Sequence, residues 1–436
     1  MSLTVNPARS QFKTEGQFAC DLPSSAYLHI PFCRRRCFYC DFPVSVVGDA
    51  YGGRNPRKNS EDSGTIQEYV TVLCREIALS AGFCQSLQTV FFGGGTPSLL
   101  SVSQLNRILE ALDRQFGIAA EAEISMEIDP ATFSLEQLQG YKAAGVNRVS
   151  LGVQAFQDEL LRVCGRSHCV ADIYEAVDLV QKAEITNFSL DLISGLPHQS
   201  LEQWQLSLAA AVAIAPAHLS CYDLVLEPVT AFGRYFQSGI EPLPADETAA
   251  QMYRLAQQIL TEAGYEHYEI SNYARSGYQC RHNRVYWENR PYYGFGMGAA
   301  SYLQGVRLTR SRTRKEYYQW VEDSTSVKVA ETPMTSHDVL LETVMLGLRL
   351  AQGVSLEAIA QKFGENTLEK IWSCLQPYYR QKWVEIAGDN GLLLNIRDGQ
   401  KLPSCGYLRL SDPEGFLFSN TILATLFSKL EEDGQL

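Results

Sequence analysis

The chain has 436 residues, enough for two or three domains of about 150 residues each. Hydrophobic residues make up 45% and charged residues 20%, a globular composition that excludes a disordered or fibrous protein. The formal net charge of −12 argues against a general nucleic-acid binder, which needs a basic face. No run approaches the ~20 apolar residues of a membrane span, and the chain does not open with the apolar core of a secretory signal. The 12 cysteines are spread along the chain and do not form the dense framework of a disulfide-rich domain. We therefore expect a cytoplasmic protein with reduced thiols and no membrane span.

Six short β-type segments alternate with amphipathic helical patterns between Tyr27 and about Ile270. The segments are YLHI from Tyr27, TVFFGG from Thr89, EISMEI from Glu123, RVSLGV from Arg148, FSLDLISG from Phe188 and HLSCYDLVL from His218. Because crossovers between parallel strands are right-handed, six such units predict a parallel sheet with helices outside it. The fold class is α/β, a partial (β/α)6 barrel, open on one side because a closed barrel has eight units. Functional residues should lie at the carboxyl ends of the strands.

Capping signals and a loop composition mark the boundaries of these units. Thr65 and Glu68 predict a capping box at the first helix, and Ser134 and Gln137 predict another. Residues 43–64 are rich in Gly, Ser, Asn and Asp and predict a solvated loop inserted into the core.

The pattern divides the chain into four parts. Residues 1–26 form an N-terminal extension, 27–270 the barrel, 271–334 an aromatic and Gly-rich linker region, and 335–436 a smaller C-terminal domain. The last part shows three helical patterns and then strand-like runs, which predicts a winged-helix-like α+β domain. Many such domains bind DNA, but this one has more acidic than basic residues, so we expect a protein-contact or covering role.

Cys33, Cys37 and Cys40 form a C-x-x-x-C-x-x-C set directly after the first strand. Three unrelated thiols or a zinc site are the alternatives, but zinc is usually held by four ligands in two pairs, and no second pair lies at suitable spacing. Three thiolates on a 4Fe-4S cluster leave one iron without a protein ligand. The set therefore predicts an iron–sulfur cluster with one iron open to chemistry.

A Gly-rich turn, GGGT, follows the strand TVFF and ends with Gly94, Gly95 and Thr96. Glycines let the backbone approach a ligand and present N–H groups to a carboxylate, while the threonine adds a hydroxyl. Beside a cluster loop, this turn is a candidate for holding the amino-acid end of a small cofactor.

Four polar residues stand at or near successive strand ends, namely Glu127, Gln154, Arg166 and Asp191. Each alone could be a helix cap or a partner for a helix terminus. Converging on one cleft, two carboxylates, an amide and a guanidinium can hold an ammonium, a ribose diol and a carboxylate. These are the groups of S-adenosylmethionine.

The motifs resemble those of the radical S-adenosylmethionine superfamily, in particular the oxygen-independent coproporphyrinogen III oxidase-like family and, within it, the heme chaperone branch. The likeness runs through YLHIPFC, GGGTPS, EIDP, LGVQAF, GRSH, SLDLISGLP, YEISNYA, HNRVYW and LRLSDPEGFLFSN. It implies that the three cysteines ligate the cluster, whose reduction cleaves bound S-adenosylmethionine to a radical. It places a first S-adenosylmethionine beside Tyr27, Gly94, Gly95, Thr96 and Glu127. Tyr39 takes the aromatic position inside the cluster loop, and Gln154, Arg166 and Asp191 match positions that contact a second S-adenosylmethionine in the oxidase.

Two departures favour the chaperone branch over the oxidase. Phe42 stands where the oxidase has a further cysteine, and only 26 residues precede Tyr27, fewer than in the oxidase. The run RHNRVYW matches a signature of the chaperone branch, which makes His282 a candidate heme contact through an imidazole nitrogen, although a structural role is the alternative.

The resemblance implies a heme chaperone that delivers heme to an acceptor, such as a respiratory membrane protein. The alternative is an oxidase that decarboxylates the propionates of coproporphyrinogen III. Reduced flavodoxin or ferredoxin is the expected electron donor, and the run Arg34–Arg36 is either its docking patch or part of a solvated loop.

Overall fold

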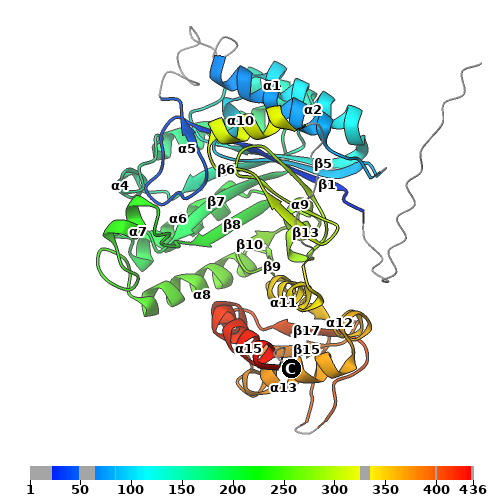
Figure 1. Ribbon diagram of the computed structural model, residues 1–436. Helices are drawn as coiled ribbons and strands as arrows, with labels where there is room; N and C mark the ends of the chain where they lie inside the picture. The colour runs from blue at the N-terminus through cyan, green and yellow to red at the C-terminus, as the bar shows by residue number, and fades with distance from the viewer. Residues whose placement is uncertain (1–21, 49–63, 84, 325–333, 398–399, 434–436) are drawn as a thin grey trace, which may run out of the picture.

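A nine-stranded sheet forms the centre of the larger part of the molecule (Figure 1). The computed structural model describes residues 22–48, 64–83, 85–324, 334–397 and 400–433. The strand order is β11-β1-β4-β5-β6-β7-β8-β10-β9, and the six strands from β1 to β8 are parallel. The predicted six-unit sheet is confirmed. Its strands are β1 Ser25–Ile30, β4 Leu87–Gly94, β5 Ile118–Ile128, β6 Arg148–Gln154, β7 Phe188–Ser194 and β8 His218–Asp223.

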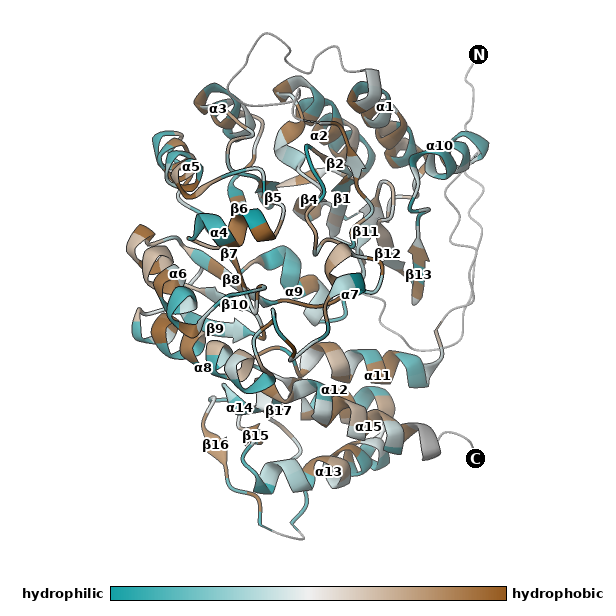
Figure 2. Cartoon of the chain, turned by 90° about the vertical axis from the view of Figure 1, so that its left-hand side faces the viewer, coloured by the Kyte–Doolittle hydropathy of each residue, from teal (hydrophilic) through white to brown (hydrophobic). Residues whose placement is uncertain are grey.

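Helices follow these strands and form an arc outside the sheet, as Figure 2 shows for α1, α2, α3, α5 and α6. Their apolar sides pack onto the strands in one continuous core. Two short helices, α4 and α7, and the 3₁₀ helix η3 lie in the loops after strands. The bounds are α1 Gly64–Leu79, η3 Pro97–Leu99, α2 Val102–Phe116, α3 Leu135–Ala143, α4 Asp158–Val163, α5 Val170–Lys182, α6 Leu201–Ile214, α7 Ala231–Tyr235 and α8 Asp246–Glu262.

The two predicted capping boxes have different outcomes. At α3, Ser134 accepts a hydrogen bond from the Gln137 N–H at 3.2 Å, as predicted. The Gln137 amide does not return to the cap but donates to the carbonyl oxygens of Ser98 and Leu100. The prediction at Thr65 is wrong, because α1 is described from Gly64 and Thr65 lies inside the helix.

Strands that follow β8 in the chain extend the sheet at both edges. β10 runs antiparallel beside β8, β9 runs antiparallel beside β10, and β11 runs parallel beside β1. The division at residue 270 stays a prediction, although strands on both sides of it share one sheet. The elements here are β9 Glu266–Glu269, β10 Asn272–Ala274, α9 Arg281–Trp287, β11 Tyr293–Phe295, β12 Ala300–Leu303, β13 Val306–Thr309 and α10 Arg314–Asp323.

The C-terminal part has its own apolar core below the large sheet, drawn in orange and red in Figure 1. Three helices accompany an antiparallel sheet of order β14-β17-β15-β16, whose strand β14 lies between the first and second helix, in line with the expected α+β arrangement. A bidentate ion pair between Arg254 of α8 and Glu414 links it to the barrel. The bounds are α11 Ser336–Gly347, β14 Val354–Ser355, α12 Leu356–Phe363, α13 Glu365–Arg380, β15 Val384–Ala387, β16 Leu393–Leu394, β17 Tyr407–Leu410, α14 Glu414–Leu417 and α15 Ser419–Asp433.

Candidate functional site

An open cavity of about 500 Å³ lies at the carboxyl ends of the parallel strands. It collects most of the side chains and turns that the sequence singled out. Lining it are Cys33, Cys37, Tyr39, Cys40, Gly94, Gly95, Thr96, Glu127, Gln154, Arg166 and Asp191. Two predicted residues, Tyr27 and His282, do not line it. Tyr27 lies behind the cavity wall, where its hydroxyl is 3.0 Å from Nδ1 of His29.

The three cysteines come from a loop that backbone hydrogen bonds hold in place. β2 Phe32–Cys33 and β3 Ser45–Val46 pair in parallel at the two ends of the loop. Within it, the Cys40 N–H donates to the Cys37 carbonyl oxygen at 3.3 Å, and the Arg36 guanidinium donates to the carbonyl oxygen of Cys40 at 3.2 Å. The predicted inserted loop 43–64 therefore begins as an ordered strand pair, and its residues 49–63 lie outside the described part of the chain.

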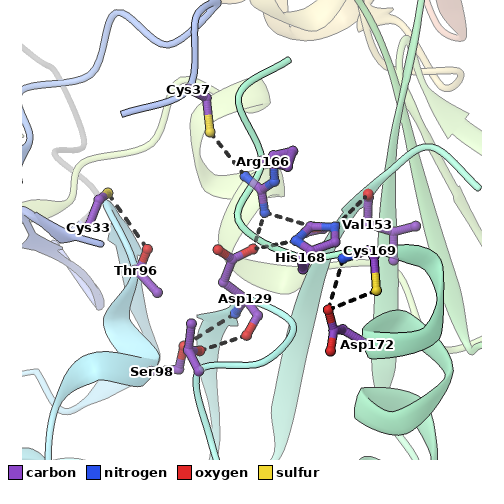
Figure 3. A network of polar contacts seen from close by, with 12 residues as sticks. Cys33, Cys37, Thr96, Ser98, Asp129, Val153, Arg166, His168, Cys169 and Asp172 are labelled. Atoms are coloured by element: carbon purple, nitrogen blue, oxygen red, sulfur yellow. Dashed lines mark hydrogen bonds and ion pairs between the residues drawn. The ribbon is translucent and has the colours of Figure 1, made fainter. Parts of the chain in front are cut away.

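The surroundings of the thiols suit an anionic cluster. The Thr96 hydroxyl donates to Sγ of Cys33 at 3.6 Å, and Nη1 of Arg166 donates to Sγ of Cys37 at 3.4 Å (Figure 3). Hydrogen bonds to cluster sulfurs are a common feature of iron–sulfur sites. Burial raises the pKa of the Cys33 thiol to about 12, so its ionised form needs the positive charge of bound iron. Within the described ranges, no three His, Cys, Asp or Glu side chains converge as the ligands of a single ion do.

The Gly-rich turn shapes the cavity wall rather than offering free N–H groups. The N–H groups of Gly95 and Thr96 donate to the carbonyl oxygens of Ile30 and Phe32, at 2.9 and 2.7 Å. A Cβ atom at Gly95 would lie 2.8 and 2.7 Å from these same two oxygens, so only glycine fits there. Because the Gly94 N–H donates to Glu127, the expected N–H donors for a ligand carboxylate are already used by the protein.

Glu127 offers a half-buried carboxyl group at the end of β5. Its pKa is raised to about 8, first by burial and then by the nearby charge of Asp191, while the Gly94 N–H at 3.0 Å lowers it. Asp191 accepts hydrogen bonds from the Ser150 hydroxyl at 2.8 and 2.9 Å, and burial raises its pKa as well. The carboxyl groups of Glu127 and Asp191 thus both have raised pKa values. Because an opposite charge favours the charged form of a carboxyl group, an ammonium bound beside them would favour their ionised forms.

Arg166 occupies the other side of the cavity, in the network of Figure 3. Its Nη2 atom forms an ion pair with Asp129 and donates to the Gly152 carbonyl oxygen at 3.0 Å. Asp129 was not predicted, although it belongs to the run SMEIDP that supplied Glu127. The sequence alone does not distinguish a functional aspartate in a strand-end turn from an ordinary one, because the distinction here depends on its ion pair with Arg166.

Gln154 stands at a break in the register between β6 and β7. Its φ of 69° lies in the left-handed region, which is uncommon for a residue with a side chain. Such backbone conformations cluster at functional sites. At this break in register, the side chain of Gln154 lines the cavity.

The structure does not support His282 as a heme contact. The ring is fully buried, with Nδ1 2.7 Å from the Thr89 hydroxyl and Nε2 2.8 Å from the Tyr286 hydroxyl. It also stacks on Phe91, with 5.2 Å between ring centroids. Because both nitrogens have hydrogen-bond partners inside the protein, neither is available to heme iron. The motif HNRVYW thus anchors α9 against β4, the structural role that was the alternative.

This role predicts a pH-dependent effect of His282→Gln. Burial lowers the pKa of His282 to about 3, against about 6.5 in an unfolded chain. Below pH 6.5 the unfolded chain takes up a proton that the folded ring does not, so this stabilisation is present above pH 6.5 and is lost as pH falls toward 3. From pH 7.5 to 5.5 the difference in unfolding free energy between wild type and variant should shrink by about 1.4 kcal/mol. Denaturant unfolding at the two pH values measures it, and a difference independent of pH would contradict this role.

Comparison with known proteins decides the family. Residues 27–210 match the radical SAM superfamily and residues 334–392 match the HemN C-terminal domain. The heme chaperone HemW of Synechocystis sp. is 49% identical over 414 residues, which cover 94% of this chain and 98% of that protein. The chain belongs to the HemW family. HemW of Escherichia coli is 37% identical over 318 residues, 71% of this chain and 80% of that protein.

The fold of this HemW family member is also that of a solved relative outside the family. Coproporphyrinogen III oxidase (HemN) of Escherichia coli, described as a radical SAM enzyme, superposes with a TM-score of 0.74 over 93% of this chain and 90% of that one. At 22% identity the likeness concerns the fold alone. In the described part of the chain, no helix is long and apolar enough to cross a membrane.

Proposed function

We propose that the chain is a cytoplasmic heme chaperone that binds a 4Fe-4S cluster and S-adenosylmethionine, and that passes heme to an acceptor such as a respiratory membrane protein. The observation that carries this proposal is the 49% identity to a HemW protein along nearly its whole length. It is supported by the cavity, in which the three cysteines and the polar strand-end residues come together although they are far apart in sequence.

Each group in the cavity has a role in this proposal. Cys33, Cys37 and Cys40 ligate three irons of the cluster, and Thr96 and Arg166 orient two of the sulfurs. When bound, the cluster and S-adenosylmethionine supply one-electron chemistry at an iron without a protein ligand.

The carboxyl groups at the ends of β5 and β7 suit the ammonium and ribose of S-adenosylmethionine. Glu127 would pair with the ammonium, because its carboxyl group lines the cavity beside the Gly-rich turn, where the Gly94 N–H donates to it at 3.0 Å. Tyr39 and Gln154 add a ring and an amide to the cavity lining. Arg166 holds Asp129 and faces Cys37, so its role is with the cluster before any second S-adenosylmethionine.

An electron donor is needed to reduce the cluster, and reduced flavodoxin or ferredoxin fits. Arg35 and Arg36 are exposed on the cluster loop of a chain whose net charge is −12. The local positive charge of this loop would steer an acidic partner to it, although the net charge of the chain is negative.

An assay with coproporphyrinogen III tests the proposal against the oxidase alternative. The protein, reconstituted anaerobically with iron and sulfide, is incubated with coproporphyrinogen III, S-adenosylmethionine and dithionite. We expect no protoporphyrinogen IX, because Phe42 replaces the oxidase's further cysteine. Formation of protoporphyrinogen IX over several turnovers would assign the chain to the oxidase instead.

A further inference from the structure

The open side of the cavity is bordered by exposed apolar side chains from two loops. Phe42 of the cluster loop is 54% exposed, and Val225, just after the end of β8, is 64% exposed. Both also line the cavity, so they stand at its mouth, whereas Tyr222 within β8 lines the cavity with its hydroxyl beside Ser220 and Asp191. Large apolar groups left exposed around a cavity mark a binding surface more often than isolated surface residues do. We call Phe42 and Val225 the apolar rim.

The two loops that carry the rim are fixed to one another. The Phe232 N–H in α7 donates to the carbonyl oxygen of Phe38 in the cluster loop at 3.0 Å. The ring of Phe232 also lies 6.2 Å from that of Phe38 and 6.4 Å from that of Tyr39, centroid to centroid. The Phe38 N–H in turn donates to the carbonyl oxygen of Cys164. The rim is therefore a preformed surface.

Charge is distributed unevenly around the mouth. Arg34, Arg35 and Arg36 line it from the cluster loop, and Arg36 also donates to the Phe42 carbonyl oxygen at 3.4 Å. Asp223 at the end of β8 and Glu227 in the loop after it also line the cavity. Asp41 on the arginine side has Arg312 as a cationic partner at 4.0 Å. A ligand with a flat apolar body and carboxylates at one edge would be turned with that edge toward the arginines.

Heme has this shape and charge, with an apolar ring and two propionates on one edge. We propose that heme docks on the apolar rim with its propionates against Arg35 and Arg36. This inference rests on the proposed chaperone function and gives that function a binding site. Docking at the rim leaves the interior of the cavity, with Glu127 and Asp191, to the cluster and S-adenosylmethionine.

Charge and polarity reversal at the rim test the docking site. Val225→Glu and Arg35→Glu are each made in the full chain and titrated with hemin after anaerobic cluster reconstitution. Both side chains are exposed, so folding should be unaffected, and iron and sulfide content confirm that the cluster is intact. We expect each to weaken hemin binding by about tenfold or more, with the Arg35→Glu effect shrinking at high salt.

Matched controls lie on other faces of the molecule. Leu206→Glu on α6 replaces an apolar side chain that is 56% exposed, and Lys429→Glu on α15 reverses an exposed charge. These should bind hemin as wild type does.

If the rim variants also bind like wild type, the docking site is wrong while the chaperone function stands. If Arg35→Glu impairs only reduction by flavodoxin or ferredoxin, the arginines belong to a donor surface and the propionate contact is overturned. If wild type itself fails to bind hemin, the chaperone function fails, which is a separate result.

Discussion

Replacing Cys33, Cys37 or Cys40 by serine should abolish the iron–sulfur cluster. Each cysteine is the only proposed protein ligand for one iron, and serine oxygen is a poor replacement for thiolate sulfur. After anaerobic reconstitution, iron and sulfide should fall to background, and the charge-transfer absorbance near 400 nm should disappear. This is the largest effect that we expect from any single substitution in the chain.

A thiol outside the cavity provides the control for this experiment. Cys405→Ser changes an exposed cysteine of the C-terminal domain and should retain normal iron, sulfide and absorbance. Full iron content in any of the three cluster-loop variants would refute the assignment of that cysteine, and full content in all three would refute the cluster site.

Glu76→Gln should cause the largest loss of stability among substitutions outside the cavity. Oε1 of Glu76 accepts from Arg310 at 2.8 Å, and Oε2 accepts from the Tyr317 hydroxyl at 2.7 Å and the Gly296 N–H at 2.8 Å. The two charged side chains are 0% and 2% exposed. Removing the carboxylate leaves the Arg310 guanidinium buried without its counter-charge, which destabilises a protein by about 3–5 kcal/mol.

Denaturant unfolding followed by tryptophan fluorescence measures this loss. Asp178→Asn is the control, because its ion pair with Lys182 on α5 is 53% and 59% exposed and exposed pairs contribute about 0–1 kcal/mol. An equal, small shift for both variants would show that Glu76 does not hold α1 to β11 and α10 as the contacts indicate.

The parallel core was predictable because each of its strands carries a local signal. β4 reads as an apolar run that ends in glycines, and β7 shows the same kind of buried pattern. β9, β10 and β11 have only three or four residues each and no periodicity to detect. β10 and β11 join the sheet by pairing with β8 and β1, which are distant in sequence, and β9 is added by a tight antiparallel turn to β10.

The spacing of residues along the chain indicated some of the site residues, whereas the burial and contacts of their side chains could not be read from the sequence. The grouping of Cys33, Cys37 and Cys40 at one cavity was predictable because they are closely spaced within one loop. The sequence could not decide between the two roles of His282, because a histidine in a motif looks the same whether its nitrogens face a ligand or, as here, Thr89 and Tyr286. Asp129 was missed because its importance comes from Arg166, which approaches it only in the folded chain.

The apolar rim was hidden for the same reason. Phe42 entered the sequence analysis only as the residue that stands in place of a cysteine, and Val225 looked like the end of a strand. Their exposure on one open cavity is a property of the fold. The substitution that removes an oxidase cysteine therefore also supplies an apolar side chain at the mouth of the cavity.

Titration of the reconstituted wild-type protein with hemin tests the central claim most directly. Absorbance in the Soret region, corrected for cluster absorbance, gives the number of heme groups bound and the dissociation constant. A heme chaperone should bind one heme per chain in a saturable way, with the cluster iron and sulfide unchanged. Hemin binding that rises without saturation, or none at all, would contradict the assignment of this chain as a heme carrier.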